Sequence, residues 1–229
     1  MSRAKREATV PATDTPRPTA ITVSDVVDTA LRIIDTRGLQ SLSIRTIAAD
    51  LSLSPMSVYK YVGSKTELLD LVLLRIISLM EIPPAFETDW MERIITTMSA
   101  WRQLLLAHPD AVPLLMERPI PRGSDGLARM QESILASLEQ ANIVGTAAAQ
   151  AFWQIFTVTV GHVMFELPRR ELTDESVRAH GEELANIARE RGLSRTLESA
   201  DALASVSLRP PFTATLRTLL RGLDAPANP

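Results

Sequence analysis

Several side chains suited to contacting DNA gather between residues 45 and 65. Two tyrosines, a methionine and a lysine fall within residues 55–61, which is unusual for a surface that faces only solvent. Tyrosine hydroxyls and lysine amines reach phosphates, whereas apolar groups contact thymine methyls in the major groove. The residues predicted to contact phosphates are Arg45, Tyr59, Lys60, Tyr61 and Lys65, and those predicted to lie nearest the bases are Pro55, Met56 and Ser57. The alternative is a helical hairpin whose tyrosines are exposed without a partner.

Two short helices joined by a tight turn are predicted to position these side chains. Ser43 stands at an N-cap position, and Ser54-Pro55 supplies a second N-cap followed by a proline at the first helical position. The inner face is formed by apolar residues at helical spacing, namely Ile47, Ala48, Leu51, Val58 and Val62. The small side chain of Ala48 allows the helices to cross closely. The pattern predicts a helix-turn-helix, with an amphipathic helix over residues 24–37 closing its core.

Residues 42–45, 53–55 and above all 58–69, VYKYVGSKTELL, resemble the DNA-binding domain of the tetracycline-repressor family. The resemblance runs from Ile21 to about Val72, and its most specific part is the aromatic pair with the Ser-Lys and Glu-Leu-Leu that follow. Ser52 departs from it, because the family usually has a glycine there, suited to positive φ; a serine costs about 1 kcal/mol of strain. The resemblance implies an effector pocket in a helical C-terminal domain and a four-helix dimer interface.

The chain has 229 residues, enough for a sizeable core, and is rich in Ala, Leu, Arg and Glu with only nine glycines. We therefore expect an all-α protein, with an N-terminal three-helix helix-turn-helix domain and a larger C-terminal helical domain for ligand binding and dimerisation. The chain has no cysteine, which excludes disulfides, thiol catalysis and thiolate metal sites and suits the cytoplasm. Its N-terminus is basic without an apolar segment, so no secretory signal is expected.

The net charge of −3 is unevenly distributed along the chain. Residues 1–20 carry +2, residues 21–68 are balanced at 0, and the remainder carries −5. Within the balanced part, Asp25, Asp28 and Asp35 lie on the first predicted helix, while the basic residues surround the hairpin. Because local charge governs DNA binding, the acidic remainder of the chain does not argue against it.

Changes in composition divide the chain. Residues 1–20 are expected to form a disordered basic arm, either a contact to the minor groove or a plain unstructured terminus. The helix-turn-helix domain is assigned to residues 21–68, the effector-binding and dimerisation domain to 69–223, and a frayed tail to 224–229. A helix from Lys65 to about Met80 is apolar nearly all round and should bridge the two domains. Ser64 is its predicted N-cap, with Glu67 as capping-box partner, and Pro83-Pro84 ends it.

Further helices are predicted over residues 90–105, 111–117, 124–141, 146–167 and 212–223, and Asp110 is the predicted cap of the second of these. The polar segment 171–192 should cover the surface or be mobile.

Residues 140–165 contain no charged side chain, and this stretch is long enough to span a bilayer. Four polar residues, Asn142, Gln150, Gln154 and His162, would each cost free energy in lipid. We therefore expect no membrane span and assign helices 146–167 and 212–223 to a homodimer interface.

Groups for catalysis or cofactor binding are scarce. There is no Gly-rich phosphate loop, nucleophile elbow or His-Glu-x-x-His run, and the three histidines are far apart. His162 and Glu166 at i, i+4 could share a metal ion, although a core histidine paired with its own glutamate is more common. No catalytic residue, cofactor or metal is therefore expected. An apolar effector pocket is expected instead, lined by Trp101, Leu105, Met116, Phe152, Phe156 and His162, with core filling as the alternative for each.

Together these patterns favour a cytoplasmic transcriptional regulator. It would act as a repressor that binds a pseudo-palindromic double-stranded DNA operator as a homodimer and is released by a small molecule. The competing hypothesis is a helical small-molecule-binding or enzymatic protein whose N-terminal hairpin is structural.

Overall fold

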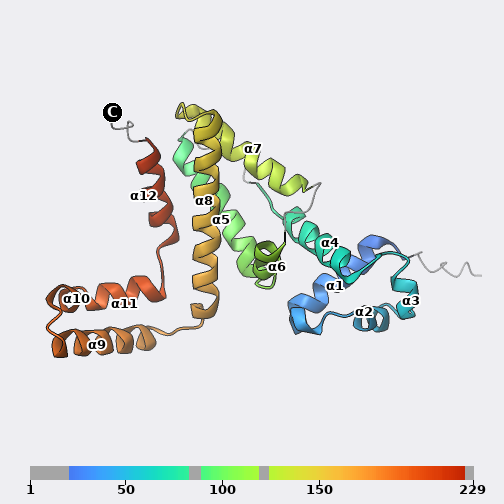
Figure 1. Ribbon diagram of the computed structural model, residues 1–229, viewed down its shortest axis with the longest axis horizontal. Helices are drawn as coiled ribbons and strands as arrows, with labels where there is room; N and C mark the ends of the chain where they lie inside the picture. Colours follow the sequence, from blue (N-terminus) through green and yellow to red (C-terminus); the bar gives the residue numbers. More distant parts are fainter. Residues whose placement is uncertain (1–20, 83–88, 119–123, 225–229) are drawn as a thin grey trace, which may run out of the picture.

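The computed structural model describes residues 21–82, 89–118 and 124–224. This part of the chain is helical, as predicted, and contains no strand. Figure 1 shows an elongated molecule in which a central body of long helices separates the N-terminal helices from a distal hairpin of helices. The predicted arm over 1–20, the Pro83-Pro84 boundary and the tail after Asp224 lie outside the described residues.

The N-terminal region contains α1 (Val23–Arg37), α2 (Ile44–Asp50), α3 (Pro55–Val58) and the start of α4 (Lys65–Ser78). Thr22 and Asp25 form a reciprocal capping box that starts α1. Hydrogen bonds from the Thr22 hydroxyl and then from its backbone N–H hold the pKa of the Asp25 carboxyl below its ordinary value. Gly38 ends α1 at φ +81°, a conformation that favours glycine, and a single 3-10 turn, Leu39–Ser41, leads to α2.

α4 connects this region to the body. It packs against α1, α6 and α7, and its buried side chains are Leu68, Val72, Leu73, Ile76 and Ile77. Ser64 caps α4 as predicted, but the capping box predicted for Glu67 is wrong. The Glu67 carboxylate accepts the backbone N–H of Gly63 at 2.8 Å rather than that of Ser64. A Cβ on residue 63 would lie 2.9 Å from this carboxylate, so the glycine permits its approach.

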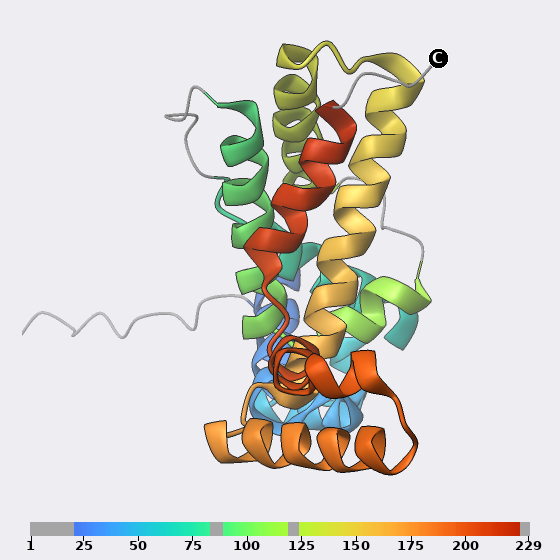
Figure 2. The same ribbon diagram turned by 90° about the vertical axis from the view of Figure 1, so that its left-hand side faces the viewer.

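The body consists of α5 (Trp90–Ala107), α6 (Ala111–Glu117), α7 (Asp125–Gln140), α8 (Gly145–Glu166) and α12 (Phe212–Asp224). Each of these helices was predicted, and its bounds agree with the predicted ones to within two residues. α5 packs on α7, α8 and α12, and Figure 2 shows α8 and α12 side by side along one face. None of the described helices has the length and apolarity needed to cross a membrane.

Asp110 occupies the N-cap position of α6, as predicted, but its side chain makes no capping hydrogen bond. Its carboxylate instead accepts the backbone N–H of Leu39 at 3.0 Å. The side chain is therefore engaged with the N-terminal region, 71 residues away along the chain.

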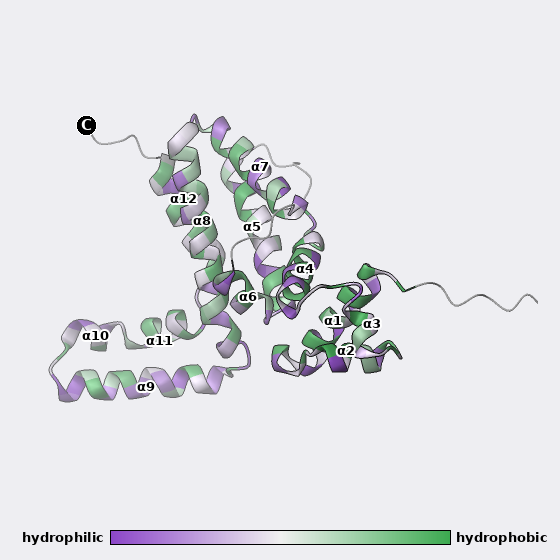
Figure 3. Cartoon of the chain, turned by 45° about the vertical axis from the view of Figure 1, so that its right-hand side comes forward, coloured by the Kyte–Doolittle hydropathy of each residue, from purple (hydrophilic) through white to green (hydrophobic). Residues whose placement is uncertain are grey.

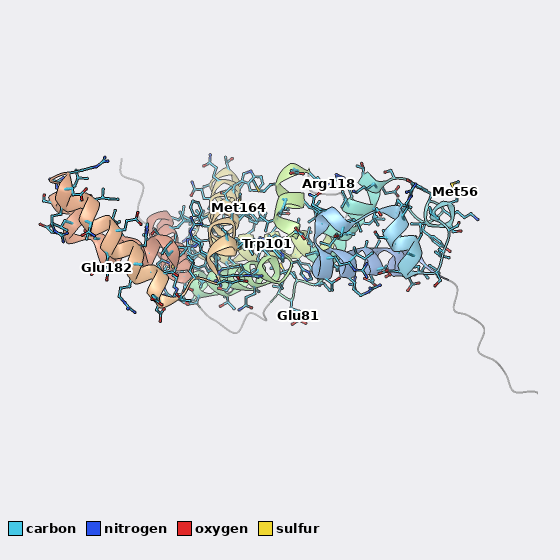
Figure 4. The ribbon with its side chains drawn as sticks, turned by 90° about the horizontal axis from the view of Figure 1, so that it is seen from below. Met56, Glu81, Trp101, Arg118, Met164 and Glu182 are labelled. Atoms are coloured by element: carbon cyan, nitrogen blue, oxygen red, sulfur yellow. The ribbon has the colours of Figure 1, made fainter. Side chains whose placement is uncertain are left out.

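The distal hairpin is built from α9 (Asp174–Glu190), α10 (Ser194–Glu198) and α11 (Ala200–Leu208). α9 occupies the polar segment expected to cover the surface, and Figure 3 shows hydrophilic and hydrophobic colouring alternating along it. α10 and α11 were not predicted. α9 and α11 approach closely at Gly181, where an added Cβ would lie 3.0 Å from a carboxylate oxygen of Asp201. Figure 4 shows Glu182 of α9 and Met56 of α3 at opposite ends of the molecule.

Candidate nucleic-acid interface and ligand cleft

The turn between α2 and α3 is closed by two backbone hydrogen bonds. The N–H of Leu53 donates to the carbonyl of Ala48 at 2.8 Å, and the N–H of Ser52 donates to the carbonyl of Ala49 at 3.2 Å. These two bonds define a Schellman motif, in which the residue after the C-cap adopts a left-handed conformation. Ser52 is that residue, with φ +55°, so the positive φ expected at this serine is confirmed.

Ser52→Gly is expected to raise the free energy of unfolding by about 0.5–1 kcal/mol. The substitution removes about 1–2 kcal/mol of left-handed strain, and the greater flexibility of glycine in the unfolded chain offsets part of that gain. Urea denaturation followed by circular dichroism measures the change. Ser52→Ala is the matched control, because it retains the strain and should not stabilise the protein. A glycine variant no more stable than the alanine variant would contradict this account of the turn.

α2, α3 and the start of α4 present most of the predicted DNA-contacting side chains to solvent. Met56 is 73% exposed and Tyr59 is 46% exposed. Five exposed residues, which we call the contact face, are Arg45, Met56, Tyr59, Lys60 and Lys65. Met56 lies at the extreme end of the molecule (Figure 4). Beneath this face, Val58 and Val62 have no exposed surface and belong to the hydrophobic core.

The three remaining predicted contact residues have additional roles. Pro55 is exposed at the first position of α3. Ser57 is half-buried, and its backbone N–H donates to the Ser54 hydroxyl at 3.1 Å, so it belongs to the cap of α3. Tyr61 is half-buried and packs against the hydrophobic core, which leaves only part of its side chain accessible.

The acidic residues of α1 are engaged away from the contact face. Asp28 accepts from Nε of Arg75 in α4 at 2.6 Å, and Asp35 lies 2.9 Å from Nδ1 of His108 at the end of α5. Within the part of the chain that the structure describes, the basic residues of the contact face form no ion pair. The surface around α3 is therefore locally positive although the whole chain is acidic.

The second candidate feature is a cleft of about 960 Å³ between α7 and α8. Phe152, Trp153 and Phe156 of α8 line it, and their ring centroids lie 5.4–6.3 Å apart. The indole of Trp101 in α5 stacks on Phe156 at 6.0 Å but has 0% exposure. The cleft therefore has an aromatic wall that is supported from behind by the core.

The residues predicted to line an effector pocket fall in different places. Phe152 and Phe156 line the cleft. Trp101 and Leu105 are buried in the core and do not line it. Met116 lies on α6 with 60% of its surface exposed, outside the residues that line the cleft. The structure thus brings Phe152, Phe156 and Trp101 together but not Met116.

Two kinds of lining residue were missed. Trp153 is 56% exposed and lies between two phenylalanines that were predicted to line a pocket. Asp125, Glu132 and Glu139 line the α7 side of the cleft. Their spacing of seven residues indicates one shared helix face and could have been found in the sequence.

His162 belongs to a separate cluster at the junction of α5, α8 and α12. Its ring meets Phe212 edge-on at 5.4 Å. Glu166, its expected partner, instead accepts from Nε of Arg102 at 2.8 Å. Burial and then the neighbouring Arg102 charge lower the pKa of His162 below its ordinary value, which favours the neutral ring. No group of three or more potential metal ligands occurs within the described residues.

Polar contacts and one close crossing join the body to the N-terminal region. Arg118, at the boundary in Figure 4, donates to the Asp70 carboxylate at 2.9 Å and to the carbonyl of Thr66 at 2.8 Å. α7 crosses α4 at Gly126, where an added Cβ would lie 2.5 Å from the carbonyl oxygen of Ile77. Because the helices meet backbone to backbone, a displacement of α7 along the cleft bears directly on α4.

Family models match both parts of the chain. The model for bacterial regulatory proteins of the tetR family matches residues 26–72, and the model for the tetracyclin repressor-like C-terminal domain matches residues 83–226. The chain belongs to the tetracycline-repressor family. The first match includes all five residues of the contact face, and the second includes the cleft between α7 and α8. The family resemblance of residues 58–69 is therefore confirmed, and it extends to the body.

Two relatives within the tetracycline-repressor family are similar in sequence. An HTH-type transcriptional regulator of Saccharopolyspora erythraea is 29% identical over 150 residues, which cover 58% of this chain and 63% of the relative. The HTH-type transcriptional repressor DrrR1 of Streptomyces coeruleorubidus is 31% identical over 159 residues, which cover 68% of this chain and 57% of DrrR1. The match thus spans less than two thirds of either relative.

Solved structures share the fold along most of the chain. Apo ActR of Streptomyces coelicolor has a TM-score of 0.78 at 24% identity, covering 91% of this chain and 97% of ActR. ActR in complex with (S)-DNPA has a TM-score of 0.74 at 25% identity, covering 92% of this chain and all of that chain. BioQ with its double-stranded DNA operator has a TM-score of 0.61 at 20% identity, covering 90% of this chain and all of BioQ.

Proposed function

We propose that this tetracycline-repressor family member is a transcriptional repressor that binds a pseudo-palindromic operator as a homodimer and is released by a small-molecule effector. The contact face carries the proposal, because it places exposed basic and aromatic side chains on a helix-turn-helix with a buried core. The name of DrrR1 as a repressor and the BioQ–operator complex support the DNA-binding part. The ActR complex with (S)-DNPA supports the effector part. A protein with this role works in the cytoplasm and needs no enzymatic activity.

Lys65 supports a contact to a DNA phosphate. It is exposed at the first position of α4, where the partial positive charge of the helix N-terminus disfavours a cation. A lysine at this position therefore does not stabilise its own helix. Together with the free N–H groups of the helix start it forms a favourable site for a phosphate oxygen.

Lys65→Ala is expected to weaken binding to all DNA sequences alike and to reduce the slope of log affinity against log salt by about 1 for each subunit bound. The measurement is a mobility-shift titration with the DNA that flanks the protein's own gene, repeated at several salt concentrations. The free energy of unfolding should change by less than about 0.5 kcal/mol, because the side chain is exposed.

Arg178→Ala is the matched control for the lysine variant, because Arg178 is an exposed cation on α9, away from the contact face. It should leave the salt slope unchanged. An unchanged slope in the Lys65 variant would refute the phosphate contact. If the wild-type protein gives no specific shift even at low salt but turns over a small molecule, the protein is an enzyme with a structural hairpin.

Homodimerisation is proposed through α8 and α12. A recognition helix as short as Pro55–Val58 contacts only a few base pairs, so two copies related by two-fold symmetry are needed to specify a genomic site. α8 and α12 lie side by side on one face of the body (Figure 2), and α8 exposes Met164 and Phe165. Large exposed apolar side chains of this kind are typical of interaction surfaces.

Release of DNA is proposed to pass from the cleft through α7 to α4. An effector between α7 and α8 that binds one position of α7 more tightly than another shifts the population of conformations. The crossing at Gly126 couples that position to α4, and Lys65 stands at the first residue of α4. Only the difference in effector affinity between the two conformations drives release, so tight binding alone is not sufficient.

A further inference from the structure

The charges around the cleft between α7 and α8 are all of one sign. Three carboxylates line it, from Asp125, Glu132 and Glu139, whereas no lysine, arginine or histidine is among the described residues that line it. None of these carboxylates forms an ion pair within the described residues. The acidic lining therefore disfavours an anionic ligand and favours a cationic one.

The carboxylates form a regular row along one wall. Successive members are seven residues apart on α7, which is two helical turns or about 10.5 Å. Ala128 and Leu135 lie between them and also line the cleft. The wall thus alternates apolar patches with negative charges, which suits a ligand that has both an apolar surface and a cationic group.

The opposite wall is aromatic. The rings of Phe152, Trp153 and Phe156 are close enough to form one continuous surface, and Trp153 is 56% exposed. Extended aromatic surfaces stack on planar rings, and the faces of indole and phenyl rings attract cations. The remaining lining of α8 is small, from Gly145, Ala148 and Ala149, and leaves room beside the rings.

One hydroxyl at the start of α7 has no hydrogen-bond partner among the described residues. The Oγ of Ser124 is buried in the lining of the cleft and has no hydrogen-bond partner within the described residues. A buried hydroxyl without a partner costs free energy that a ligand N–H donor would recover. This observation is independent of the carboxylates and favours the same kind of ligand.

We infer that the effector of this protein is a planar aromatic cation, bound with its ring system on the aromatic wall of α8 and its protonated nitrogen toward the carboxylates of α7. The inference rests on the proposed effector site and specifies the class of molecule that occupies it. The opposed walls explain why acidic side chains line a predominantly apolar cleft. They also predict that ring and charge contribute separately to affinity.

The test compares three tricyclic probes of similar shape and different charge, measured by calorimetry on the full-length protein. 9-Aminoacridine is cationic at neutral pH, acridine is uncharged and acridine-9-carboxylate is anionic. The cation is expected to bind about 10-fold or more tightly than the neutral ring. Its attraction to the carboxylates and its attraction to the aromatic faces each raise the affinity severalfold. The anion is expected to bind most weakly. Equal affinities for the three probes would overturn the inference.

Variants distinguish the contributions of the two walls to the affinity for the probes. The triple variant Asp125→Asn, Glu132→Gln, Glu139→Gln should reduce the preference for the cation over the neutral ring to about 2-fold or less. Trp153→Ala should weaken both probes by about the same factor, because it removes ring contact and not charge. Glu182→Gln on α9 is the control for a lost carboxylate, because Figure 4 shows it at the far end of the molecule. A preference that survives in the triple variant would overturn the assignment.

A mobility-shift assay with the same probes separates this inference from the proposed function when the wild-type protein is compared with the triple variant, because a planar aromatic cation also binds DNA itself. If 9-aminoacridine binds with the expected preference but leaves the DNA complex intact, the ligand class stands and effector-controlled release is wrong. If 9-aminoacridine fails to bind while the triple variant changes the dimer dissociation constant, the cleft is covered by a second copy of the chain and the inference is overturned.

Discussion

Replacing Tyr59 and Lys60 together by alanine is expected to weaken operator binding by about 1,000-fold or more, because each DNA contact contributes about 1–3 kcal/mol and the proposed dimer loses both contacts twice. Tyr59 is 46% exposed and Lys60 is exposed, so neither is a main component of the core. The free energy of unfolding should therefore change by less than about 1 kcal/mol. Mobility-shift titration gives the affinity, and urea denaturation gives the stability.

Tyr61→Phe is the matched comparison for the double variant. Tyr61 is half-buried against the core, and the phenylalanine keeps its ring in place while removing only the hydroxyl. We expect this variant to lose at most about 30-fold in affinity, since one hydrogen bond to a phosphate contributes about 1 kcal/mol and the proposed dimer loses it twice. A double variant that folds normally and keeps operator affinity within about threefold would show that α3 does not enter the groove.

Local signals predicted the N-terminal region in detail. Ser43, Ser54 and Ser64 each accept the backbone N–H of the residue three positions on, as an N-cap does. The left-handed conformation of Ser52 was expected from the family resemblance, because the family usually has a glycine at this position of the turn. All of these features depend on residues that are neighbours in the sequence. The pattern of side chains alone therefore contains the information needed to predict them.

Partners far apart in the sequence could not be predicted in the same way. Asp110 precedes a helix and was expected to cap it, but its carboxylate binds the N–H of Leu39 instead. Glu166 stands one turn after His162, but the structure pairs it with Arg102, 64 residues away. Helical spacing shows which side chains share a face. It does not show which of several available groups on a neighbouring helix will reach them.

The cleft was predicted only in part for a related reason. Phe152 and Phe156 were identified because large apolar residues on a charge-free helix are buried or bind a ligand. Met116 was chosen by residue type, yet the short α6 buries its other face and leaves Met116 60% exposed. The carboxylates of α7 were given no role, because acidic residues on an amphipathic helix normally face water.

Trp101→Ala is expected to lower the free energy of unfolding by about 3–5 kcal/mol, the range for truncating a large buried aromatic side chain. Trp101 has no exposed surface, and it supports Phe156 through a stack of 6.0 Å. Its loss leaves a cavity at the centre of the body, where α5 packs against α8. Urea denaturation at fixed protein concentration measures the effect, since the proposed dimerisation would make apparent stability depend on concentration.

Trp101→Phe distinguishes a core residue from a ligand-contacting one, because it is expected to fold where the alanine variant is marginal. The phenyl ring retains most of the stack on Phe156, and the substitution removes the indole Nε1, which is buried without a hydrogen-bond partner in the described part of the chain. The loss of stability should therefore be less than about 2 kcal/mol, since removing an unsatisfied donor offsets part of the lost contact. If Trp101 acts only by supporting the cleft, the phenylalanine variant binds 9-aminoacridine within about threefold of wild type, a change of less than 1 kcal/mol. A loss of tenfold or more at nearly unchanged stability would instead make Trp101 part of the ligand site, because a purely supporting side chain affects affinity only by disturbing the wall in front of it.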